Sequence, residues 1–316
     1  MEAAAYKKKP IASIESLAST LSISQAQLIY VADNAERYYS ISKKSTLKPD
    51  GTYRITYRVA YPLKIIQERI KTQIFDAVIF PSYLQAARDE NNPRGYIANA
   101  HSHVGQTILL KEDIRKFFPS IRPIYVHKMW KYLFHFPEEV ANILTKLTTY
   151  QDGVPQGAKT SAAISNLIFW DKEPYLIVRL QERGFVYTRY IDDISISADR
   201  NVAKIELQWA ISQIFTMLST KQVQPNRKKH SLQTKSKRMS VHRLCLNSGE
   251  PTIGKKKQSQ IRAAVKQLEG MVVNESNIDE YITRFRSVRG QVATFARTQP
   301  QKAEKYLDRL LLINPI

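Results

Sequence analysis

Two adjacent aspartates, Asp192 and Asp193, interrupt a run of β-branched and aromatic residues at 186–197. Carboxylates oppose strand formation, and their burial is costly unless a cation compensates the charge. The flanks at 186–190 and 194–197 therefore predict a tight β-hairpin that projects both carboxylates from the edge of a sheet. An ordinary solvated turn is the alternative for such a pair, so the interpretation depends on the rest of the chain.

A third carboxylate, Asp113, follows a short apolar strand that is expected at 106–112. Three carboxylates on adjacent strand ends can hold two Mg²⁺ ions about 3.5–4 Å apart, which stabilises an in-line phosphoryl displacement. One ion would lower the pKa of an attacking hydroxyl, and both would neutralise charge on the phosphate and the leaving group. A helix N-cap is the alternative for Asp113, and the local sequence leaves it open.

The charge of the chain points to a polyanionic partner. Among 316 residues, lysine and arginine number 48 against 28 acidic residues, a net charge of +20. Such a surplus favours phosphates, which recruit cations and release counterions, so nucleic acid is the expected partner. The hydrophobic fraction of 43% predicts a folded protein.

The sequence also predicts a cytoplasmic protein with no membrane partner. Cys245 is the single cysteine and cannot form an intramolecular disulfide, which fits a reducing compartment. No apolar run approaches the roughly 18 residues that a membrane span needs. The N-terminal segment MEAAAYKKKP lacks the apolar centre of a signal peptide.

The periodicity of the remaining chain predicts an α+β fold. Turn chemistry at Lys48-Pro49-Asp50-Gly51 predicts a hairpin, followed by a strand in which apolar residues alternate with polar ones from Tyr53 to Val59. Helices are expected at 13–36, from Pro62 onward, at 123–135, at 137–149, from about 159 with a kink or end at Pro174, near 202–219, and over about the last 60 residues.

Three segments occur in the order and spacing of the polymerase motifs of reverse transcriptases. They are Asp113 with Phe117-Phe118, the run Gly153-Val154-Pro155-Gln156-Gly157 leading to Ser165-Asn166, and Tyr190-Ile191-Asp192-Asp193. The chain therefore resembles RNA-directed DNA polymerases. Its segment Asn99-Ala100-His101-Ser102-His103 is similar to the Asn-Ala-x-x-His signature of the bacterial retron subgroup. The sequence departs from that subgroup where Val241-His242-Arg243 stands in place of Val-Thr-Gly.

The resemblance implies a right-hand polymerase with an antiparallel palm sheet. Fingers and palm would occupy 1–250, and a small helical, RNA-binding thumb would occupy 251–316. It further implies that two Mg²⁺ ions are held by Asp113, Asp192 and Asp193, with the backbone carbonyl of Ile114 as a further ligand. Lys229 falls where the family has a lysine that can protonate pyrophosphate; a generic phosphate clamp is the alternative.

Further residues take roles from the same resemblance. Phe118 falls where the family places an aromatic ring that excludes a ribose 2′-hydroxyl, although a core position is the alternative and is favoured for Phe117. Gln156 would line the nucleotide pocket, and Arg58 would reach the triphosphate, with Arg54 as the substitute; solvated positions are the alternative for these side chains. RNA contacts are expected from Asn99, His103, His242, Arg243, Lys255, Lys256 and Lys257, with a scaffold role as the alternative for Asn99 and His103 and a solvated charge run for the lysines.

A retron enzyme would use dNTPs to copy a dedicated, structured noncoding RNA, which serves as the template and primes through an internal 2′-hydroxyl. The product would be a branched RNA–DNA hybrid (msDNA) used in antiphage defence beside a neighbouring effector protein. Two alternatives remain. One is a reverse transcriptase of a group II intron or a diversity-generating element, and the other is a non-catalytic RNA-binding scaffold on a polymerase fold.

Overall fold

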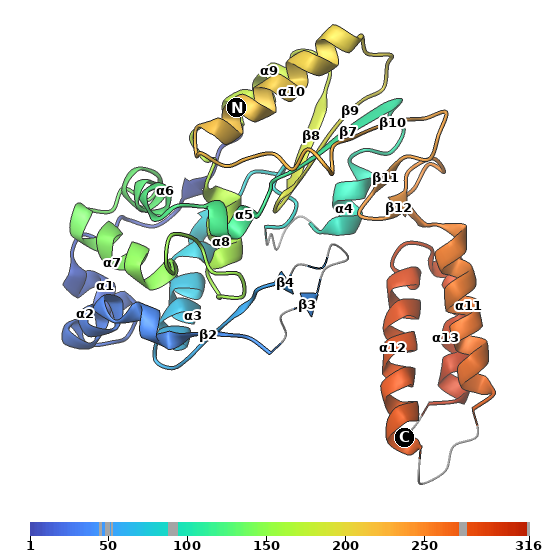
Figure 1. Ribbon diagram of the computed structural model, residues 1–316, viewed down its shortest axis with the longest axis horizontal. Helices are drawn as coiled ribbons and strands as arrows, with labels where there is room; N and C mark the ends of the chain where they lie inside the picture. The colour runs from blue at the N-terminus through green and yellow to red at the C-terminus, as the bar shows by residue number, and fades with distance from the viewer. Residues whose placement is uncertain (44–45, 48–50, 52, 88–93, 272–276, 315–316) are drawn as a thin grey trace.

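The computed structural model describes residues 1–43, 46–47, 51, 53–87, 94–271 and 277–314. Helices and antiparallel sheets alternate along the chain, so the α+β class predicted from the sequence is confirmed (Figure 1). The expected turn residues Lys48, Pro49 and Asp50 lie outside the described residues.

A four-stranded antiparallel sheet occupies the centre of the structure, with strand order β10-β7-β9-β8. Its strands are β7 (Ile108–Asp113), β8 (Val186–Tyr190), β9 (Asp193–Ala198) and β10 (Ser231–Thr234). The register places Asp113 opposite Asp193. Strands β8 and β9 form the predicted hairpin, so the chain reverses next to the end of β7.

Two helices lie alongside this sheet, α9 (Glu173–Gln181) and α10 (Lys204–Ser219), and α9 packs on β8 and α10 (Figure 1). The helix expected from about 159 is divided into α8 (Ser161–Leu167) and α9. Pro174 does not end a helix. It lies in the first turn of α9, where the missing N–H has no partner to lose.

Several further helices precede α8 along the chain. They are α1 (Ile14–Thr20), α2 (Gln25–Asp33), α3 (Leu63–Gln73), α5 (Phe117–Ser120), α6 (Pro123–Lys128), α7 (Glu138–Thr148), and the irregular helices η1 (Ala35–Tyr38), η2 (Phe75–Ala77) and η3 (Met129–Leu133). The single helix predicted at 13–36 is interrupted. Ser22 has a φ of +50°, and the Ser24 side chain accepts a hydrogen bond from Gln27 N to begin α2.

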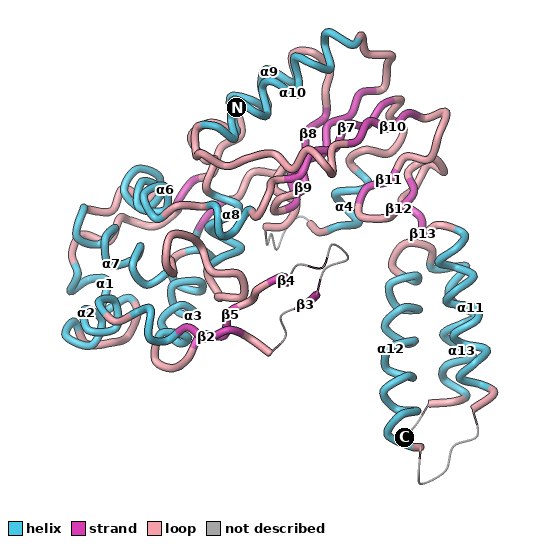
Figure 2. Tube along the Cα trace, in the orientation of Figure 1, coloured by secondary structure: helices cyan, strands magenta, loops and turns pink. Residues whose placement is uncertain are grey.

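Three small two-stranded pairs complete the N-terminal half. Strand β1 (Ala5–Tyr6) pairs with β6 (Val78–Ile79), β2 (Tyr39–Ile41) pairs with β5 (Tyr57–Val59), and β3 (Thr46–Leu47) pairs with β4 (Tyr53–Arg54). The strand predicted from Tyr53 to Val59 is thus two strands. Figure 2 shows β3 and β4 beyond β2 and β5, away from the helices.

The C-terminal part begins with a three-stranded sheet of β11 (Ser240–Val241), β12 (Leu244–Cys245) and β13 (Thr252–Ile253). It leads into the helices α11 (Lys255–Glu269), α12 (Ile278–Ala296) and α13 (Pro300–Leu312). This region has its own apolar core, which also includes Ala100 of α4 (Tyr96–His101) and Leu109 of β7. Apolar packing therefore connects the C-terminal part to the central sheet. None of the helices in the described ranges has the length and apolar character needed to cross a membrane.

Candidate active site

The three aspartates that the sequence singled out meet at one end of the central sheet. Asp113 ends β7 and Asp193 begins β9 directly opposite it. Asp192 lies in the turn before Asp193, and its carbonyl oxygen accepts a hydrogen bond from Ile114 N at 3.0 Å. Ile191 has a φ of +58°, which lets the chain reverse within the segment 190–193, hereafter the aspartate turn. Asp113, Ile114, Asp192 and Asp193 thus form one cluster.

Asp192 lies in an environment that disfavours its negative charge. Burial, together with the nearby carboxylates of Asp193 and Asp113, raises the pKa of Asp192 to about 6. A bound cation would relieve the repulsion between these groups. Carboxylate and carbonyl oxygens are the ligands that Mg²⁺ and other hard divalent ions prefer, so the donor set fits such an ion.

Asp113 is already engaged by two side chains. Asn226 Nδ2 donates to Oδ1 at 2.8 Å, and Lys229 Nζ donates to Oδ2 at 2.6 Å. Burial opposes the charge of Lys229, but the hydrogen bond to Asp113 and the negative charges of Asp113, Asp192 and Asp193 together outweigh it and raise the pKa of the lysine. With these contacts in place, no group of three or more His, Cys, Asp or Glu side chains within the described ranges is arranged to hold a metal ion. A cation bound at Asp113 Oδ2 would compete with Lys229 for that oxygen.

A buried ion pair that sequence reasoning missed supports the aspartate turn. Arg189 on β8 contacts both carboxylate oxygens of Glu173 at 2.6 and 2.7 Å, and both side chains are almost fully buried. Its guanidinium also donates to the carbonyl oxygens of Ser165, Asn166 and Ile191. Arg189 therefore ties the second polymerase-like motif to the third. Two features of the sequence could have indicated this ion pair: Arg189 lies within a strand that is otherwise buried, and the acidic residue Glu173 lies beside Pro174.

The Gly-Val-Pro-Gln-Gly loop is held between two other predicted site segments. Val154 N donates to Phe118 O at 3.1 Å, and Tyr57 N donates to Gln156 O at 2.7 Å. A Cβ on Gly157, whose φ is +110°, would lie 2.7 Å from Tyr57 O. Only glycine permits this approach, so the loop glycine has a steric role.

These contacts bring the segments of Arg58, Phe118 and Gln156 together. Arg58 follows Tyr57 in β5 and is exposed, while Phe118 and Gln156 are partly buried. Phe117 is a core residue, with its ring stacked 6.0 Å from that of Phe169. Of the two adjacent rings, Phe118 is thus the one with surface exposed.

Asn99 and His103 are fully buried behind the aspartate turn. His103 Nε2 and Asn99 Oδ1 both lie within hydrogen-bond distance of Thr188 Oγ1 on β8. Burial lowers the pKa of His103 to about 3, so its ring is neutral. Because a direct RNA contact requires exposed surface, these positions support the scaffold alternative for both residues.

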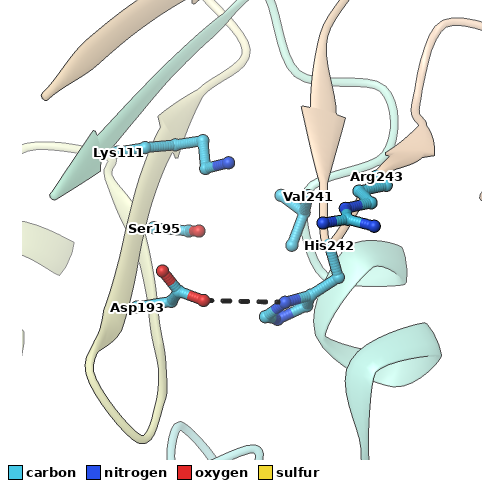
Figure 3. Close-up of a pocket in the computed structure, with 6 residues that line it drawn as sticks. All are labelled: Lys111, Asp193, Ser195, Val241, His242 and Arg243. Atoms are coloured by element: carbon cyan, nitrogen blue, oxygen red, sulfur yellow. Dashed lines mark ion pairs between the residues drawn. The ribbon is translucent and has the colours of Figure 1, made fainter. Parts of the chain in front are cut away.

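His242 and Arg243 form the two-residue turn between β11 and β12, with φ values of +47° and +67°. They line a pocket of about 330 Å³ together with Lys111, Asp193, Ser195 and Val241 (Figure 3). His242 Nδ1 lies 3.9 Å from Asp193 Oδ2. The segment that departs from the retron pattern is thus beside the aspartates. Lys255, Lys256 and Lys257 are exposed at the start of α11, where Lys257 Nζ donates to Gln291 Oε1.

Comparisons with known proteins agree with the motifs. The sequence profile of the family "Reverse transcriptase (RNA-dependent DNA polymerase)" matches residues 41–263. The retron Ec48 reverse transcriptase of Escherichia coli is 30% identical over 322 residues, which cover 97% of this chain and 77% of that protein. The retron Se72 reverse transcriptase of Salmonella heidelberg (strain 579083-10) is 30% identical over 315 residues, or 98% and 82% of the two chains. The retron Ec86 reverse transcriptase of Escherichia coli is 27% identical over 238 residues, or 75% and 71%. The chain belongs to the reverse transcriptase family and, within it, to the bacterial retron reverse transcriptases.

Proposed function

We propose that this protein is an RNA-directed DNA polymerase that copies a dedicated, structured noncoding RNA into a branched RNA–DNA hybrid. The observation that carries the proposal is the pairing of Asp113 with Asp193 across β7 and β9, with Asp192 in the adjoining turn. The central sheet would be the palm, and the β2–β5 region and the N-terminal helices would be the fingers, within 1–250. Helices α11–α13, in 251–316, would be the thumb.

Two Mg²⁺ ions held by Asp113, Asp192, Asp193 and the Ile114 carbonyl would activate the primer hydroxyl and neutralise the phosphates. The other residues bind and orient the substrate. Lys229 would donate a proton to the leaving pyrophosphate. Its contact with Asp113 Oδ2 at 2.6 Å supports this role, because it brings the lysine beside a proposed metal ligand.

The nucleotide would bind between the segments that the Gly-Val-Pro-Gln-Gly loop connects. Arg58 would contact the triphosphate, Gln156 would contact the nucleotide, and the Phe118 ring would occupy the volume of a ribose 2′-hydroxyl. The backbone contacts of the loop with Tyr57 and Phe118 support this arrangement, because they fix the three segments relative to one another.

The RNA would lie against the basic C-terminal part. Lys255, Lys256 and Lys257 are exposed at the beginning of α11, where they can contact phosphates, and Arg243 lies nearer to the aspartates. A net charge of +20 supports a polyanionic template. The relation to retron enzymes supports a noncoding RNA that serves as template and primer, and a role in antiphage defence beside a neighbouring effector.

The test is to express the protein together with its flanking genomic DNA and to sequence the nucleic acid that copurifies with it. The proposal expects DNA joined to RNA through a 2′–5′ bond, which a debranching nuclease releases. A linear product with a 3′–5′ start would retain the polymerase and remove the retron mechanism. No DNA product, together with no primer extension on a supplied RNA template, would favour a non-catalytic scaffold.

A further inference from the structure

A chain of buried side chains runs from the central sheet toward the aspartate turn. His103 lies between two strands, with Nδ1 2.7 Å from Ser197 Oγ on β9 and Nε2 2.7 Å from Thr188 Oγ1 on β8. Thr188 Oγ1 lies 2.5 Å from Asn99 Oδ1. All four side chains are buried. Buried polar groups are costly unless they are paired, so these contacts form as a set.

The series of hydrogen-bonded side chains continues to the turn between β11 and β12. Asn99 Nδ2 lies 2.7 Å from His242 Nε2, and the His242 ring packs against Tyr190 with centroids 4.6 Å apart. These two contacts hold the ring so that Nδ1 faces Asp193 Oδ2 at 3.9 Å, the contact drawn in Figure 3. This distance exceeds that of a hydrogen bond, as is common for active-site contacts before a ligand binds.

The donor and acceptor properties of these side chains determine which atom donates in each hydrogen bond of the series. An ionised Asp193 only accepts hydrogen bonds, so it favours a proton on His242 Nδ1. In a neutral ring, a protonated Nδ1 leaves Nε2 free to accept from Asn99 Nδ2, which lies 2.7 Å away. The reversed orientation of the Asn99 amide would turn a lone pair of His242 toward the carboxylate, which is repulsive.

The donors and acceptors can be assigned in the same way from Asn99 to His103. With Asn99 Nδ2 donating to His242, Asn99 Oδ1 accepts the single hydroxyl hydrogen of Thr188. Thr188 then accepts from His103 Nε2–H, and His103 Nδ1 accepts from the Ser197 hydroxyl. His103 and His242 should therefore carry their protons on different nitrogens, Nε2 in the first and Nδ1 in the second.

We propose that His242 is a positioning residue, whose tautomer is set by Asn99 and whose Nδ1–H orients the Asp193 carboxylate for a divalent cation. The inference rests on the proposed function for the role of Asp193 as a metal ligand. Partners that orient a ligand in this way typically contribute 10–100-fold to metal affinity. The Asn-Ala-x-x-His segment would then act on the metal site from inside the protein.

The tautomers can be observed directly by NMR of the full-length protein labelled with ¹⁵N-histidine. Spectra of His103→Gln and His242→Asn assign the two rings among the six histidines. The proposal expects a protonated Nδ1 in His242 and a protonated Nε2 in His103. A His242 ring protonated at Nε2 would overturn it, because its lone pair would then face Asp193.

A second measurement tests the effect on the cation. Mn²⁺ binding to the free protein is followed by electron paramagnetic resonance, with Asp193→Asn identifying the site. His242→Asn places an amide near the Nδ1 position, whereas His242→Gln places its amide near Nε2. We expect His242→Gln to weaken Mn²⁺ binding about tenfold, and His242→Asn to stay within about threefold of the wild type. Cys245→Ser, in the adjoining strand β12, is the matched control and should leave the affinity unchanged.

The proposal is overturned if the Gln and Asn variants bind Mn²⁺ equally, whether both match the wild type or both are weakened. Thermal unfolding of each variant reports any loss of folding separately. If the wild type extends no primer while the Mn²⁺ affinities differ as expected, the proposed function fails and the positioning role stands. If it extends primers while the two variants are indistinguishable, the positioning role fails alone.

Discussion

Lys229 Nζ lies 2.6 Å from Asp113 Oδ2, so a cationic side chain pairs with one of the three clustered acids. Asn226 holds the other oxygen of the same carboxylate at 2.8 Å. A divalent cation bound at Asp113 would therefore compete with Lys229 for this carboxylate. Binding of the metal would release the lysine toward the substrate phosphates, which couples assembly of the site to the availability of its proton donor.

Lys229→Gln should slow DNA synthesis and leave RNA affinity nearly unchanged. A positioned general acid typically contributes about 10²-fold or more to the rate. Single-turnover extension of a primer by one nucleotide measures this effect. Lys228→Gln is the matched control, since Lys228 is an adjacent exposed lysine. Equal rates for the two variants would show that Lys229 is not the proton donor.

Phe118→Ala should admit ribonucleotides, because truncation of the ring opens the volume that a 2′-hydroxyl would occupy. The measurement is the ratio of kcat/KM for each ribonucleotide and its deoxynucleotide. Phe117→Ala is the comparison. Its ring is buried against Phe169, so this variant should lose about 3–5 kcal/mol of stability but keep its sugar selectivity. Selectivity lost in Phe117→Ala and retained in Phe118→Ala would reverse the assignment.

Arg189→Met should destabilise the protein by about 3–5 kcal/mol, because it leaves the buried Glu173 carboxylate without its cation. The double variant Arg189→Met/Glu173→Met should lose less than the sum of the two single variants. Denaturant unfolding gives these free energies. The pair of exposed Arg200 and partly exposed Glu206 serves as the control, and Arg200→Met should have a much smaller effect. If the double variant loses as much unfolding free energy as the two single variants added together, the account is contradicted.

His103 should make the stability depend on pH. Its pKa is about 3 when folded, because burial lowers it, against 6.5 as the ordinary value. Between these values the unfolded chain binds the proton and the folded protein does not, so stability is lost as the pH falls from 6.5 toward 3. The slope is about 1.4 kcal/mol per pH unit.

The measurement for His103 is the difference in unfolding free energy between the wild type and His103→Gln as the pH is varied. This difference removes the contribution of the carboxylates, which titrate in both proteins. The difference should be constant above pH 7 and should shrink as the pH falls. A difference that does not change between pH 7 and pH 5 would mean that folding leaves the pKa of His103 unaltered, which contradicts the account.

The strands of the aspartate hairpin and the β7 strand could be predicted because local signals agree there. β-branched residues, alternation and the two acids all specify the same hairpin, and the structure forms it at 186–198. The helix at 13–36 was predicted without its interruption, because Ser22 gives no strong signal for a positive φ. Pro174 was expected to kink or end a helix because proline is disfavoured in helix interiors, but it is favoured in the first turn, and periodicity alone does not separate the two positions.

The partners of the site residues could not be predicted, because they come from distant parts of the chain. Asn99 meets His242 across 143 positions, and Lys229 meets Asp113 across 116 positions. The motif positions identified Lys229 and Asp113 but not their contact. Arg189 was missed altogether, because an arginine in a strand is usually solvated, and only the packing of α9 on β8 places Glu173 beside it.

The most direct test of the central claim is primer extension on an RNA template by Asp192→Asn, with RNA binding measured in parallel. The account predicts that the variant binds RNA like the wild type but extends the primer about a thousandfold more slowly or not at all, because loss of a metal ligand removes several kcal/mol of transition-state stabilisation. Extension at the wild-type rate would contradict the assignment of the aspartate turn as the polymerase centre.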